Sequence, residues 1–110
     1  MNRKVPLKIR KLMKELKEGL VRIYGDKLKG VYLYGSYARG DYRQGSDVDV
    51  MILLKDYNNY FEELRRSTEL ASDVSLEYEV TVSRLIIKEI QWQESIMPVV
   101  RNIHKDGMPA

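Results

Sequence analysis

Two aspartates at the head of an apolar run have a spacing suited to chemistry. Asp47 and Asp49 open the segment DVDVMILL, whose alternation predicts a strand over residues 47–54. Side chains two apart on a strand share a face, which places these carboxylates roughly 6–7 Å apart at their Cα atoms. Such a pair needs a cation to offset its charge, and Mg²⁺ binds through one or two carboxylates plus substrate phosphates. The alternative is two surface acids at a solvent-facing strand edge.

A glycine and a serine precede the aspartates at a predicted strand-to-helix junction. Gly35 lets a phosphate approach the backbone closely, and the Ser36 hydroxyl adds a hydrogen-bond donor. Arg39, in the following helix, could bind a phosphate through paired hydrogen bonds or form an ion pair with a nearby acid. Ser46, directly before Asp47, could cap or buttress the intervening turn. A simple turn with a helix cap would contain the same Gly-Ser pair.

A third carboxylate is expected from the segment VSLEYEVTV, whose alternation predicts a strand over residues 74–82. Glu77 and Glu79 occupy its polar face. If this strand lies beside the strand over 47–54, one glutamate completes a triad of acids that can hold two metal ions about 3.5–4 Å apart. One metal would lower the pKa of an attacking hydroxyl, and the other would neutralise a triphosphate. Ordinary outward acids on a half-exposed strand would give the same pattern.

The elements that must position these residues follow from hydrophobic periodicity. Apolar residues at three- and four-residue steps predict an amphipathic helix over residues 7–24. Other patterns predict a strand that ends at Gly35, a short helix over 36–40, a turn over 41–45 and helices over 58–71, 84–93 and 98–106. This order predicts an α/β (α+β) fold with a mixed three- to four-stranded sheet flanked by helices. We expect a single domain over residues 1–110, with the amphipathic helix in 1–27 and the core in 28–108.

The composition excludes several other kinds of site. Among 110 residues there is no Cys and one His, which excludes disulfides, Cys-based zinc sites and multi-His metal centres. A Ser-His-Asp triad could form only through His104. No apolar run is long enough to span a membrane, so we expect a cytoplasmic protein without membrane contact. Residues 1–29 carry ten Lys and Arg against three Asp and Glu, which makes RNA or a polyphosphate a conceivable partner, although a solvated basic face is the simpler interpretation.

Gly35-Ser36, ten further residues and then Asp47-x-Asp49 form the pattern GSYARGD…SDVDV, which resembles the minimal nucleotidyltransferases (MNT) of the polymerase-β-like nucleotidyltransferase superfamily. SLEYEVTVS resembles the strand that supplies the family's third acid, and MPVVRNIHKDGM resembles its closing helix. The resemblance therefore covers about residues 28–108. It implies a nucleotidyltransferase fold and Mg²⁺-dependent transfer of a nucleoside monophosphate, usually AMP from ATP, to a hydroxyl with release of pyrophosphate.

The resemblance also assigns roles to residues. It implies that the Gly-Ser turn holds the triphosphate and that three acids hold two Mg²⁺ ions, with Glu79 where the family usually has Asp. The expected nucleotide-binding set is Gly35, Ser36, Arg39 and Ser46, and the expected catalytic and metal-binding set is Asp47, Asp49 and Glu79.

Single-domain members resemble the antitoxin half of HEPN/MNT toxin–antitoxin pairs, in which the MNT protein attaches AMP to a tyrosine of its HEPN partner and silences an RNase. The resemblance thus implies an antitoxin that AMPylates a HEPN toxin. A non-catalytic antitoxin is a second hypothesis, motivated by Glu79 and by eight Tyr that could furnish an interface. A third is nucleotidyl transfer to a small molecule or an RNA end, with a second subunit completing the acceptor site.

Overall fold

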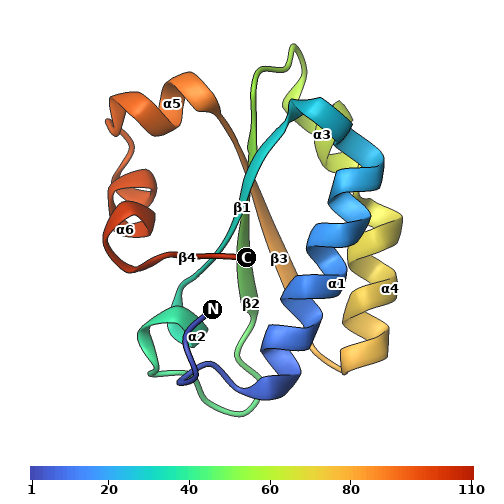
Figure 1. Cartoon of the computed structure of the whole chain (residues 1–110), viewed down its shortest axis with the longest axis vertical. Coiled ribbons are helices and arrows are strands. Elements are labelled where there is room, and N and C mark those ends of the chain that lie inside the picture. The colour runs from blue at the N-terminus through green and yellow to red at the C-terminus, as the bar shows by residue number, and fades with distance from the viewer.

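A four-stranded mixed sheet forms the centre of the molecule, and the computed structural model describes all 110 residues (Figure 1). The strand order is β3-β2-β1-β4. β2 pairs antiparallel with β1 and parallel with β3, and the short β4 pairs antiparallel with β1. The strands are β1 (Leu28–Tyr34), β2 (Val48–Leu54), β3 (Val82–Lys88) and β4 (Met108–Pro109). The predicted fold class, a mixed sheet flanked by helices, is confirmed.

Helices cover both faces of this sheet (Figure 1). One face carries α1 (Leu7–Tyr24), α3 (Tyr60–Arg66) and α4 (Thr68–Tyr78), and the other carries α5 (Glu89–Glu94) and α6 (Pro98–Asp106). The short α2 (Ser36–Arg39) follows β1 directly, and a 3₁₀ turn, η1 (Gly25–Lys27), joins α1 to β1. None of the helices has the length and apolarity that crossing a bilayer requires.

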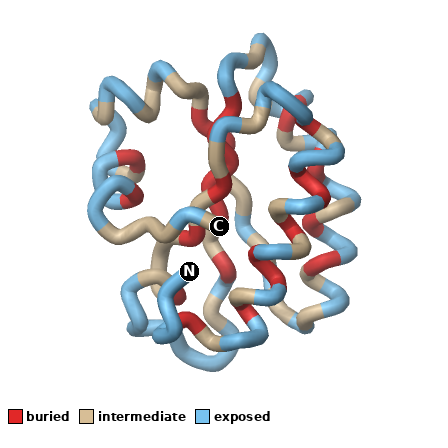
Figure 2. Tube along the Cα trace, viewed as in Figure 1, coloured by how far each residue is buried: buried red, intermediate tan, exposed pale blue.

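Alternation along β2 divides the core into two layers. Val50 and Ile52 belong to a cluster under α1, whereas Met51 and Leu53 belong to a second cluster under α6. Figure 2 shows buried residues along the central strands and on helix sides that face them. The α1 stripe that predicted an amphipathic helix is buried here as Ile9, Leu12, Met13, Leu16 and Leu20. β2 is therefore apolar on both faces along most of its length, and its polar residue, Asp49, lies near its first residue, at the end of the sheet.

The segment after β2 differs from the expectation. The predicted helix over 58–71 is two helices that meet at Ser67, and the predicted strand over 74–82 is wrong, because α4 continues to Tyr78. Ala71 and Val74 are buried at helical spacing, so the segment satisfied a helical period as well as a strand period.

The next strand therefore begins later than expected. β3 occupies residues for which a helix over 84–93 was predicted, and only α5 remains helical there. The charged residue Arg84 interrupts the apolar pattern of this strand, so the sequence did not indicate a buried strand here. Its guanidinium is folded inward and donates to the carbonyl of Leu64 at 2.6 Å and to the Ser67 hydroxyl at 2.7 Å.

Candidate active site

The two aspartates lie at the open end of β2, on the sheet face covered by α5 and α6. Asp47 directly precedes β2, and Asp49 is its second residue. Val48 between them is buried under α1, so the carboxylates point to the opposite face. Asp47 is exposed and Asp49 is half-buried. Asp49 is paired with Tyr34 on β1 and with Ser83 on β3, which places it between the two neighbouring strands.

The Gly35 turn is in direct contact with this pair. Gly35 has φ 74° and ψ −151°, and Ser36 begins α2 immediately after it. A Cβ on Gly35 would collide with Asp49 Oδ2 and would stand 3.1 Å from Asp49 Cγ. Glycine is therefore required here both by the backbone angle and by the close carboxylate. The structure brings together the Gly-Ser turn and the aspartate pair that the sequence spacing singled out.

The electrostatics of the pair favour a cation. Burial raises the pKa of Asp49, the neighbouring charge of Asp47 raises it further, and Arg39 acts in the opposite direction. Burial and the Asp49 charge together raise the pKa of Tyr34 to about 12. Neither aspartate forms an ion pair within 4 Å, since the five ion pairs of the chain lie elsewhere. Two neighbouring carboxylates without an ion-pair partner would fit one Mg²⁺, whose remaining ligands would come from phosphates and water.

A cavity of about 230 Å³ opens beside Asp49. Gly35 and Arg39 line it from one side, and Asn102 and Asp106 line it from α6. The Arg39 guanidinium forms an exposed ion pair with Asp41 at 3.3 Å and remains accessible to a phosphate. Sequence reasoning missed Asn102 and Asp106. Their four-residue spacing on a predicted helix with an apolar opposite face was the available signal, but nothing local placed that helix near Asp49.

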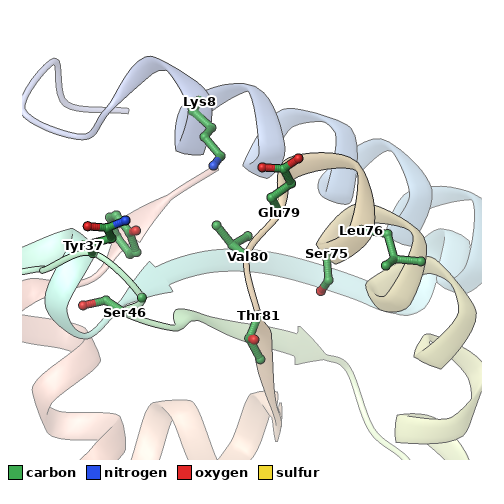
Figure 3. A pocket seen from close by; sticks show the side chains of 10 residues that line it. Lys8, Tyr37, Ser46, Ser75, Leu76, Glu79, Val80 and Thr81 are labelled. Atoms are coloured by element: carbon green, nitrogen blue, oxygen red, sulfur yellow. The ribbon is translucent and has the colours of Figure 1, made fainter.

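Glu79 lies apart from this cavity. It ends α4 with left-handed backbone angles, φ 55° and ψ 44°, and lines a separate cavity of about 650 Å³ together with Lys8 and Ser46 (Figure 3). Figure 3 shows the Glu79 side chain directed towards Lys8. No set of three or more His, Asp or Glu side chains is arranged to hold a metal ion. The expected grouping of Glu79 with the aspartates on neighbouring strands is therefore absent, because its segment is helical.

Two other predicted residues also have structural roles. The Ser46 hydroxyl accepts a hydrogen bond from the Arg43 backbone at 2.8 Å, which buttresses the turn before the aspartates. Glu77 faces Glu15 of α1, and burial and that neighbour raise the pKa of Glu77.

The only histidine has a structural environment as well. His104 stacks on Trp92, with ring centroids 3.5 Å apart, and its Nε2 lies 2.9 Å from the Trp92 carbonyl. It thus joins α6 to α5, and it is not among the residues that line the Asp49 cavity.

Comparison with known proteins agrees with this geometry. Residues 13–108 match the nucleotidyltransferase domain family. Two proteins of Methanocaldococcus jannaschii, both provisionally named protein adenylyltransferases, are similar in sequence. One is 42% identical over 83 residues, which cover 76% of this chain and 83% of the relative. The other is 34% identical over 97 residues, which cover 88% and 92% respectively.

Solved structures share the fold. A Sulfolobus solfataricus protein, provisionally described as a nucleotidyltransferase, superposes with a TM-score of 0.62 at 27% identity, covering 93% of this chain and 80% of that one. The MNT antitoxin in complex with the tri-AMPylated HEPN toxin of Shewanella oneidensis superposes with a TM-score of 0.54 at 21% identity, covering 91% and 70%. The second likeness concerns the fold alone.

Proposed function

Because the chain belongs to the nucleotidyltransferase domain family, we propose that it transfers AMP from ATP to a hydroxyl of a partner protein, with Mg²⁺ at Asp47 and Asp49. The observation that carries this proposal is the aspartate pair, which has no ion-pair partner within 4 Å and of which Asp49 contacts the Gly35 turn. We propose further that the acceptor is a tyrosine of a HEPN toxin and that the protein acts as its antitoxin. The names of the similar adenylyltransferases and the antitoxin fold neighbours support this choice.

The residues of the site have distinct tasks in this reaction. Asp47 and Asp49 would hold Mg²⁺, which would supply positive charge to the triphosphate and to the acceptor hydroxyl. Gly35 lets the phosphates approach the backbone, and Ser36 and Arg39 supply hydrogen-bond donors to them. On the other side of the cavity, Asn102 of α6 offers an amide that can orient the substrate.

The chemical step is a displacement at the α-phosphorus. The acceptor oxygen forms a bond to phosphorus while the bond to the bridging oxygen of the β-phosphate breaks, and pyrophosphate leaves with that electron pair. The hydroxyl proton passes to a carboxylate of the site or to water. The aspartates therefore contribute by holding charge and position rather than by forming a covalent intermediate.

The test combines the purified protein with labelled ATP, Mg²⁺ and a candidate partner, the protein encoded by the neighbouring gene, which the proposal expects to be a HEPN protein. We expect label on the HEPN protein, and the double variant D47N/D49N should reduce transfer to background while remaining folded by circular dichroism. D73N, on the exposed surface of α4, is the matched loss of a carboxylate and should transfer normally. Absence of label with wild-type protein, under conditions in which a related MNT protein works, contradicts the proposal.

One observation favours a second function, neutralisation by binding alone. The β3 residue beside Asp49 is Ser83, whereas a third acid was expected on the neighbouring strand. Survival of cells that express the toxin separates the two functions. Full protection by D47N/D49N supports binding alone, and lost protection, with the complex still formed, supports catalysis.

A further inference from the structure

The neighbouring strand presents hydroxyls to the aspartates. β3 runs parallel to β2, with Ser83 opposite Asp49. The Val48 backbone donates to the Thr81 carbonyl at 2.8 Å, which continues the pairing to the level of Asp47. Directly paired residues of adjacent strands project to the same face. Ser83 of β3 and Thr81, which directly precedes this strand, are both exposed and therefore lie on the aspartate face, and Thr81 also lines the cavity that contains Glu79. Figure 3 shows Val80 and Thr81 on the segment that connects Glu79 to β3.

No other carboxylate replaces the missing one. Glu79 lines the separate cavity, and Glu77 faces α1. Asp106 shares a cavity with Asp49, yet it forms no three-acid group with the aspartates. Asp47 and Asp49 therefore stand at the head of β2 without a third acid arranged beside them to hold a metal ion.

We propose that this site holds a single divalent cation on the aspartate pair and that Thr81 and Ser83 stand where a second cation would need a carboxylate. The inference rests on the proposed function and deepens it. One Mg²⁺ balances the two negative charges of the pair. A second cation about 3.5–4 Å away would be repelled by the first, and a neutral hydroxyl offsets none of that repulsion. The protein would therefore bind one divalent cation, whereas a site with three acids can bind two.

Manganese is the probe for this proposal, because its electron paramagnetic resonance spectrum distinguishes isolated ions from coupled pairs. We expect the wild-type protein with an equimolar non-hydrolysable ATP analogue to bind one Mn²⁺ per chain and to show no coupled pair. T81D and S83D, made separately, each introduce a carboxylate on the aspartate face, where the third acid of a two-cation site would be needed. At least one of them should bind two Mn²⁺ per chain and show the coupled signal.

S72D adds the same charge on the exposed surface of α4 and should bind one ion. D106N should also bind one. A coupled pair in the wild-type protein, a lower count in D106N, or no second ion in either folded aspartate variant overturns the inference. If either variant fails to fold, the wild-type spectrum still decides. Failure of the proposed function has a different signature, namely that D47N/D49N binds Mn²⁺ and the analogue as tightly as the wild-type protein.

Discussion

At the scale of single residues, Gly35 and Asp49 depend on each other. The carboxylate occupies the space that a Cβ on Gly35 would need, and the glycine adopts a backbone angle that other residues rarely adopt. The local spacing in the sequence was sufficient to predict that the Gly35 turn and Asp49 lie together, because both belong to the connection between two paired strands. Asn102 and Asp106 come from a distant helix, and only the three-dimensional structure could assign them to the same cavity.

Gly35→Ala should affect both stability and transfer. The new methyl group collides with the Asp49 carboxylate, and the positive φ adds strain of order 1–3 kcal/mol. We expect a lower free energy of unfolding in urea and loss of label transfer. Gly40→Ala is the control, because Gly40 has φ 87° with nothing within 4 Å of its Cβ position. It should show the strain alone, and equal activity loss in both variants would contradict a role for the contact.

Arg39→Gln should weaken nucleotide binding. Loss of a charge-assisted hydrogen bond to phosphate is expected to raise KM for ATP about tenfold, equivalent to about 1.4 kcal/mol. Steady-state kinetics at saturating partner protein measure the change. Arg43→Gln removes an equal charge from the adjacent turn, away from the Asp49 cavity, and should change KM far less. A similar rise in both variants would indicate a general effect of charge.

At the scale of elements, the predicted helices and strands were correct where the hydrophobic pattern was long or where Pro and Gly marked its ends. The predicted helices over 7–24 and 98–106 have the same bounds as α1 and α6, and the predicted strand over 47–54 begins one residue before β2. It failed between Ser67 and Lys88 because short alternating runs fit a strand or a helix. The misplacement of Glu79 follows from that single error, since the residue ends a helix that was interpreted as a strand.

Arg84 fastens β3 to the junction of α3 and α4. Arg84→Met keeps the apolar stem but removes donors to Leu64 and to Ser67, whose side chain is fully buried. We expect a loss of about 1–3 kcal/mol in the free energy of unfolding, because buried acceptors lose a charged partner. Arg65→Met breaks an exposed ion pair with Glu62 and should cost under about 1 kcal/mol. Equal losses in the two variants would contradict this role of Arg84.

At the scale of the whole molecule, the two faces of the sheet have different roles. The α1 and α4 layer holds the larger core, and the α5 and α6 layer covers the face with the aspartates. In the larger layer, two acidic side chains face each other where α1 and α4 meet, and their charges repel. Glu77 faces Glu15, whose Oε2 is buried without a hydrogen-bond partner.

The repulsion between Glu77 and Glu15 should make the stability of the folded protein depend on pH. Because the pKa of Glu77 is raised in the folded protein, stability is lost as pH rises from the ordinary glutamate range through the raised value. Glu77→Gln should therefore have a higher Tm than wild type at pH 7, and the difference should vanish near pH 4. Asp73→Asn on the same helix should not show this pattern in thermal scans. A lower Tm for Glu77→Gln at pH 7 would contradict the repulsion.

The contact between Gly35 and Asp49 also bears on the entropy of binding. A carboxylate that leans on the backbone of a tight turn has few rotamers open to it before any ligand arrives. Ordering a free acidic side chain costs roughly 1–2 kcal/mol, and here much of that cost has already been met during folding. The turn that we propose for phosphate binding would therefore also hold Asp49 ready for the cation.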